Sequence, residues 1–242
     1  MLTNTAVKYR LWENRKALII FYLIIYLVMI ASIIAVSSVN EVITLNGLEF
    51  ASMIFIFIVG LEFSEPFQML LQNGCSRKTI FLSFVYSIIP IATVMALIDG
   101  LNGILMNQFT NYENMFLQFY GPRFTEAVGV MQFIEGFLWS LTAYTMVAII
   151  GLFITALYYR MNKQMKWIVS IGVPAFFMIV LPLIDTSFFN GAIIEGIGKV
   201  LDFAWGYQNG YNPYFSMISC ILFSVIFGSL AYSLIRRAVV RD

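Results

Sequence analysis

Near its start the chain reads KYRLWENRKALIIFYLIIYLVMIASIIAV, from Lys8 to Val36. The part before Ala17 is rich in basic residues, whereas the part from Ala17 to Val36 carries no charged side chain. An α-helix needs about 20 apolar residues to cross the hydrocarbon core of a bilayer. We therefore expect a permanent membrane-spanning helix over 17–36, preceded by a short basic helix that lies at the membrane surface.

Further apolar runs of similar length follow, and basic residues separate them in a regular pattern. All of the 14 Lys and Arg residues except Arg123 and Lys199 precede the first run, follow the last run, or lie in every second gap. Short loops rich in Lys and Arg stay on the cytoplasmic side of a membrane. The pattern predicts an all-α integral membrane protein with both termini in the cytoplasm, forming one domain over 1–242. Its six spans are expected at about 17–36, 48–65, 79–98, 133–158, 167–184 and 213–235.

The composition agrees with a membrane location and excludes several classes of function. The chain is 60% hydrophobic and 11% charged, with a mean hydropathy of +0.85, whereas soluble domains carry about 25% charged residues. A net charge of +1 argues against a nucleic-acid partner. The absence of histidine removes most zinc sites and most nucleophile–base pairs. We expect no catalytic residues and no metal site, and we expect Cys75 and Cys220 to form no disulfide.

The gap between the second and third spans has the features of a short helix. Pro66 suits the start of a helix, Gly74 suits the left-handed residue that ends one, and Ser76 can cap the third span. Three apolar side chains of this helix, those of Phe67, Leu70 and Leu71, share one face at helical spacing. This face must be buried against something. It can dock on the membrane or on neighbouring spans, or it can enter a groove of a soluble partner.

In topology, length and this turn, the chain resembles the ABC exporter permeases of the type-two family. The sharpest element of the resemblance is the turn Asn73-Gly-Cys-Ser-Arg-Lys-Thr79. The resemblance implies that the helix before this turn is a coupling helix, which inserts into a separate cytoplasmic ATPase subunit. Its coupling residues would be Phe67, Gln68, Leu70, Leu71, Arg77 and Lys78.

The same resemblance implies how the whole assembly works. ATP and Mg²⁺ would be bound by the partner ATPase and not by this chain, which contains no complete phosphate-binding loop. A second permease, identical or different, would complete the pore in a bacterial cytoplasmic membrane. The expected function is export of a hydrophobic or amphipathic substrate, such as an antimicrobial or toxin peptide.

Two segments on the predicted outer side have helical character. The segment 99–132 is apolar in patches, and we expect one or two helices that lie on the membrane surface. Before the sixth span, apolar residues recur at helical spacing, and Glu195 and Lys199 form an i, i+4 pair. We expect a re-entrant or interfacial helix there, with the candidate site residues Ile194, Ile197, Leu201 and Trp205.

The acidic residues lie close to the predicted ends of the spans. Glu62 and Glu65 are expected near the inner face, paired with Arg77, Lys78 or Arg160. Glu49, Glu135 and Asp185 are expected near outer ends. With no carboxylate predicted in the middle of the bilayer, the sequence argues against a proton-coupled or sodium-coupled carrier.

Two other classes of function remain open. One is the membrane subunit of a vitamin importer, which also pairs with an ATPase but lacks a coupling helix of its own. The other is a membrane protein that binds a peptide without transporting it, as an immunity or sensor protein would.

Overall fold

The computed structural model describes residues 2–38, 44–124 and 129–238. Within these residues, six helical segments are long and apolar enough to cross a membrane. This confirms the predicted multi-pass membrane architecture. The segments are Thr3–Val36, Leu48–Gln72, Arg77–Phe109, Val130–Arg160, Lys163–Phe188 and Pro213–Arg236.

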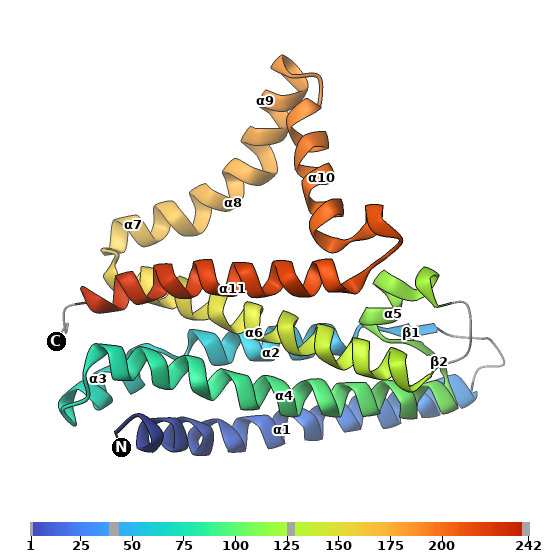
Figure 1. The fold of residues 1–242 in the computed structure, drawn as a ribbon, viewed down its shortest axis with the longest axis horizontal. Coiled ribbons are helices and arrows are strands. Elements are labelled where there is room, and N and C mark those ends of the chain that lie inside the picture. The colour runs from blue at the N-terminus through green and yellow to red at the C-terminus, as the bar shows by residue number, and fades with distance from the viewer. Residues whose placement is uncertain (1, 39–43, 125–128, 239–242) are drawn as a thin grey trace.

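Four long helices lie side by side along the molecule, together with the shorter α2 (Figure 1). They form what we call the body. Its long helices are α1 (Leu2–Ser38), α4 (Arg77–Phe109), α6 (Val130–Arg160) and α11 (Pro213–Arg236), and α2 is Leu48–Leu61. The short helix α3 (Ser64–Gln72) lies at the end where the described chain begins and finishes, which we call the terminal end.

The opposite end of the body, which we call the sheet end, carries a small parallel sheet. Strand β1 (Thr44–Asn46) pairs with β2 (Asn111–Glu113). The short helix α5 (Met115–Tyr120) and the 3-10 turn η1 (Gly121–Arg123) follow β2. The helices that end or begin at the terminal end carry most of the basic residues, as the alternating pattern predicts; Arg241 lies outside the described residues. That this end faces the cytoplasm remains a prediction.

Helix α6 is central to the body and packs against α2, α4 and α11. Its contact with α2 is made possible by glycines at the crossing. A Cβ atom added at Gly60 would lie 2.1 Å from the carbonyl oxygen of Ala148, and one added at Gly151 would lie 2.6 Å from that of Phe57. Small residues at such crossings allow membrane helices to approach backbone to backbone.

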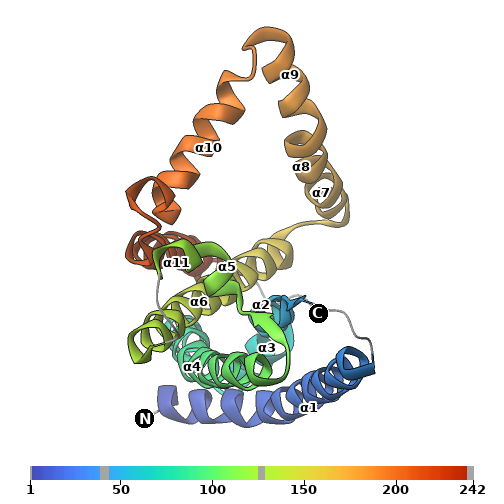
Figure 2. The ribbon, with the colours of Figure 1, turned by 90° about the vertical axis from the view of Figure 1, so that its right-hand side faces the viewer.

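Residues 163–205 leave the body and form what we call the arm. The chain runs outward through α7 (Lys163–Trp167), η2 (Ile168–Gly172), α8 (Val173–Ala175), η3 (Phe176–Val180) and α9 (Leu181–Phe188), and returns through α10 (Ala192–Trp205); η2 and η3 are π-helical. Figure 2 shows the two limbs standing away from α11 and meeting at the α9–α10 turn. Across 163–205, all of which is described, Asp185 alone is buried. The fifth predicted span, 167–184, therefore has no residue that the described chain buries.

Two predicted boundaries near the start of the chain differ from the structure. The expected surface helix and first span form one continuous helix, α1, because no proline or glycine interrupts residues 2–38 and two polar side chains of the lead-in, Arg10 and Asn14, are buried in the body. Helix α2 ends at Leu61, before the predicted end at position 65, so Glu65 belongs to α3 and not to α2.

The segment predicted to contain surface helices is also organised differently. Helix α4 continues to Phe109, well beyond its predicted end at position 98, so Asp99 lies inside the helix. Strand β2 and the short helix α5 follow it. Elsewhere in the chain, the turn η4 (Tyr207–Asn209) lies between α10 and α11. The two strands are an exception to the predicted all-α fold, and their pairing joins two segments that are far apart in the sequence.

Candidate functional site

Helix α3, the predicted coupling helix, forms where the sequence places it. Gly74 has φ of 76°, the left-handed conformation that ends a helix. The Ser76 hydroxyl accepts a hydrogen bond from the backbone N–H of Thr79 at 3.1 Å and so caps α4. The α3 boundary differs slightly from prediction, because Ser64 and Glu65 form its first turn before Pro66.

The apolar face of α3 is buried against the protein's own helices. Phe67 and Leu70 are buried in a cluster with residues of α1, α4, α6 and α11, and Leu71 is half-buried beside it. The ring of Phe67 stacks on Phe63 at 4.7 Å between centroids and meets Tyr159 edge-on at 5.6 Å. Of the three surfaces that the sequence left open, the structure shows the neighbouring spans.

The side of α3 that faces away from the body is polar. Glu65 and Gln72 are exposed and Gln68 is half-buried, and Lys78 in the first turn of α4 is exposed as well. Arg77 is directed toward the body, since its Nη1 donates a hydrogen bond of 2.8 Å to the carbonyl oxygen of Arg236 at the end of α11. Only part of the predicted coupling set is therefore accessible at this end of the molecule.

The basic neighbour of Glu62 is an arginine that the sequence did not single out. Arg10 is fully buried in α1, with its guanidinium carbon 3.8 Å from the centre of the Phe84 ring. Its Nη1 donates a hydrogen bond of 2.8 Å to the carbonyl oxygen of Glu62. The ion pairs among the described residues include Arg123–Glu135 and Lys199–Glu195. The pairing of Glu62 and Glu65 with Arg77, Lys78 or Arg160 stays a prediction.

The predicted helix before the last span is α10, and its two ends are held differently. At its start, the Asp185 carboxylate accepts hydrogen bonds from the backbone N–H groups of Ile193 at 2.8 Å and Ile194 at 3.0 Å. At its end, the carbonyl oxygen of Trp205 accepts a hydrogen bond of 3.0 Å from Tyr120. Burial raises the pKa of this tyrosine to about 12, so that its hydroxyl stays protonated and can donate.

The other candidate residues of α10 are exposed on the surface of the described chain. Ile194, Ile197 and Leu201 are each more than two-fifths exposed, and Lys199 and Glu195 form the predicted pair at 2.7 Å. The helix that the sequence predicts is confirmed. Only the end of α10 packs on the body among the described residues: the ring of Phe203 meets Phe215 of α11 edge-on at 5.6 Å between centroids, and Trp205, alone among the four candidates, packs beside Phe119.

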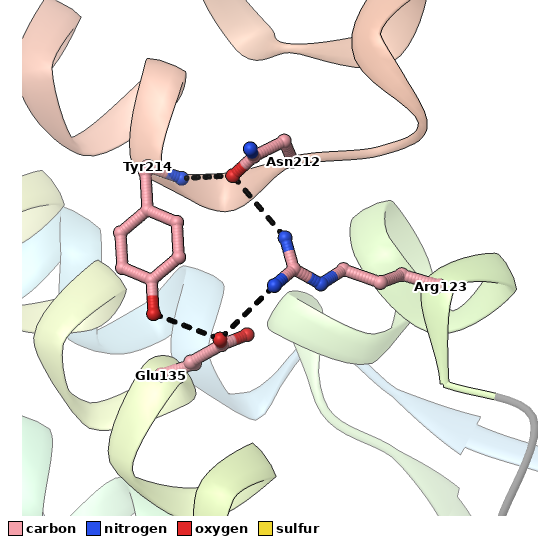
Figure 3. A network of polar contacts seen from close by, with 4 residues as sticks. All are labelled: Arg123, Glu135, Asn212 and Tyr214. Carbon is pink, nitrogen blue, oxygen red and sulfur yellow. Dashed lines mark hydrogen bonds and ion pairs between the residues drawn. The ribbon is translucent and has the colours of Figure 1, made fainter.

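A polar network joins η1, α6 and the start of α11 at the sheet end (Figure 3). The two Nη atoms of Arg123 reach Glu135 Oε1 and Asn212 Oδ1, each at 3.2 Å. The Tyr214 hydroxyl donates to the same Glu135 oxygen at 2.9 Å, and its backbone N–H donates to Asn212 at 3.1 Å. The network therefore ties η1 to α6 and to the start of α11.

Removing the centre of this network is expected to loosen the sheet end. In Glu135→Ala, Arg123 and Tyr214 lose a shared acceptor that is 2% exposed, so we expect a loss of about 1–3 kcal/mol in the free energy of unfolding. Thermal unfolding in detergent measures the change. Glu195→Ala breaks an ion pair in which both partners are 68% exposed and should change stability little. Equal effects of the two substitutions would contradict this prediction.

The feature that sequence reasoning missed is a group of buried acids and tyrosines between α1, α2, α4 and α6. Asp99 accepts hydrogen bonds from Tyr22 at 3.0 Å and from Tyr144 at 2.6 Å, one on each carboxylate oxygen. Close by, Glu49 in the first turn of α2 accepts a hydrogen bond from Tyr112. We call these five residues the acid–tyrosine cluster.

One signal in the sequence points to this cluster. Asp99, Gly100, Asn102 and Gly103 look like the start of a loop, yet the apolar run resumes at Ile104 and continues for another turn. A polar interruption of this kind is compatible with a longer helix whose polar residues face inward. The structure confirms that alternative, since Asp99, Asn102 and Gly103 are all buried in α4.

The chain matches no known protein family, no curated protein and no solved structure. Its function has to be inferred from the geometry of the chain.

Proposed function

We propose that this chain is the transmembrane subunit of an ATP-driven exporter in a bacterial cytoplasmic membrane. It works as one half of a pore, and a separate cytoplasmic ATPase binds at the terminal end and supplies energy, ATP and Mg²⁺. The substrate class is a hydrophobic or amphipathic molecule such as a peptide.

The observation that carries the proposal is the way α3 is attached. Phe67 and Leu70 attach it to the helices of the body, while its residues Glu65 and Gln72, and Lys78 at the start of α4, are exposed. A soluble partner that moves α3 would move the spans on either side of it, because the chain enters α3 from α2 and leaves it into α4. A short helix with a buried apolar face and an exposed polar face is a suitable lever for such a partner.

The arm gives independent support for a paired pore. In a single subunit, the most apolar stretch of the span Lys163–Phe188 contains no buried residue. Its large apolar side chains therefore remain for lipid or for another membrane protein to cover. In the proposed assembly, the second permease provides part of this cover.

Tagged protein should be purified from its native membrane, and the proteins recovered with it should be identified by mass spectrometry. We expect an ATPase subunit with the wild type. The double variant Gln72→Trp, Lys78→Glu changes the exposed side of the terminal end and should reduce the recovered ATPase about tenfold or more, as loss of a central interface contact does.

The matched control is Gln108→Trp, Lys199→Glu, which makes the same kinds of change at exposed positions outside the terminal end. It should keep the ATPase. Recovery of no ATPase with the wild type would overturn the proposal and favour a protein that binds its peptide without transport. Equal recovery with both double variants would place the ATPase elsewhere.

A further inference from the structure

The acid–tyrosine cluster contains two carboxylates without a basic partner. Glu49 and Asp99 are each 6% exposed, and neither belongs to the ion pairs formed among the described residues. Buried carboxylates within a membrane-spanning bundle are costly unless something compensates their charge. The tyrosine hydroxyls donate hydrogen bonds to both, but they carry no positive charge.

A small cavity lies between these two carboxylates. Its volume is about 40 Å³, and Glu49, Asp99 and Gln132 are among the residues that line it. A cavity needs roughly 10–15 Å³ of this kind of volume to hold one water-sized particle, so there is space for an ion and a water molecule.

An unsatisfied polar side chain also lines the cavity. Gln132, at the start of α6, is 9% exposed, and its Oε1 atom has no hydrogen-bond partner among the described residues. An amide oxygen is a good ligand for a hard cation. The polar side chains that line the cavity, which include Ser140 and Asn114, supply only oxygen and amide groups.

From this geometry we propose that the cavity between Glu49 and Asp99 binds a small monovalent cation, with Na⁺ as the best fit. The ion would connect α2, α4 and α6 at one place in the bundle. A divalent ion fits less well, because no three Asp, Glu, Cys or His side chains meet anywhere in the described chain, and Ca²⁺ sites generally use several carboxylates among six to eight oxygen ligands.

A single positive charge is enough to compensate the two carboxylates at this site, because they need it to different degrees. Glu49 lies in the first turn of α2, where the helix dipole favours an anion, and Tyr112 donates a hydrogen bond to it. Asp99 lies within α4, far from both helix ends, and depends more on a cation. This site is independent of the proposed ATPase interface at the opposite end of α2.

The test uses the purified chain alone in detergent. Binding of radioactive ²²Na⁺ and thermal unfolding should be measured in NaCl and in choline chloride at equal ionic strength. We expect saturable Na⁺ binding and a higher unfolding temperature in NaCl. Asp99→Asn and Glu49→Gln should each weaken Na⁺ binding about tenfold or more, as expected when a charge-assisted contact is lost.

The control variant is Asp202→Asn, which removes an exposed carboxylate outside the cavity, and it should bind Na⁺ as the wild type does. Equal unfolding temperatures in the two salts, without ²²Na⁺ binding, would overturn the proposal. So would a stability that depends on pH alone, because a proton would then neutralise the cluster. Since no ATPase is present, either result is independent of the co-purification experiment.

Discussion

The variant Gly60→Val is expected to lose the packed body. A Cβ atom at this position would lie 2.1 Å from the carbonyl oxygen of Ala148, which is backbone and cannot rotate away. Helices α2 and α6 would have to separate along their contact, which also includes Gly151. We expect a loss of about 3 kcal/mol or more in the free energy of unfolding, at the upper end for overpacked positions.

The measurement is the yield of monodisperse protein in detergent and its midpoint of thermal unfolding. Gly196→Val is the matched control, because a Cβ atom at this helical glycine of α10 has no neighbour within 4 Å. A Gly60→Val protein that unfolds at the wild-type temperature would show that α2 and α6 are not in backbone contact.

Truncation of the buried face of α3 is expected to destabilise the whole protein. Phe67 is fully buried among residues of several helices, and Phe67→Ala should cost about 3–5 kcal/mol through lost burial and a cavity. Gln72→Ala, at an exposed position of the same helix, should leave the unfolding temperature nearly unchanged. The unfolding midpoints of both variants in detergent decide the matter.

Substitutions at the buried positions of α3 are unsuitable for testing the ATPase interface. A carboxylate at position 70, where the wild-type leucine is 5% exposed, would be buried without a partner. Loss of an ATPase from such a variant would then reflect unfolding. If Phe67→Ala kept full stability but lost the ATPase, α3 would have to leave the body when it binds its partner.

Much of the fold follows from local patterns in the sequence. The apolar runs predict the six spans, because only a helix satisfies its own backbone over this length in lipid. Gly74 and Ser76 predict where α3 ends and α4 begins, since both act on the residues next to them. The helix before the last span and its Glu195–Lys199 pair are likewise local features, and the structure confirms them.

The candidate site was less accessible to this reasoning. An apolar stripe on α3 shows that one face is buried, but it does not identify the surface that covers it. The two strands and the acid–tyrosine cluster depend on residues that are close in space and distant along the chain, such as Tyr22 and Asp99. Lipid-facing and protein-facing side chains are equally apolar, so hydropathy could not separate them.

By itself the sequence determined that the chain has six segments long and apolar enough to cross a membrane and roughly where each lies, because suitability for lipid depends on the length and polarity of each segment alone. The tertiary structure decided the rest. Only three-dimensional packing brings Gly60 against Ala148, buries the Phe67 side of α3 in the body, and leaves every residue of 163–205 except Asp185 unburied. These outcomes depend on which helices meet, and a pattern within one helix carries no record of its neighbours.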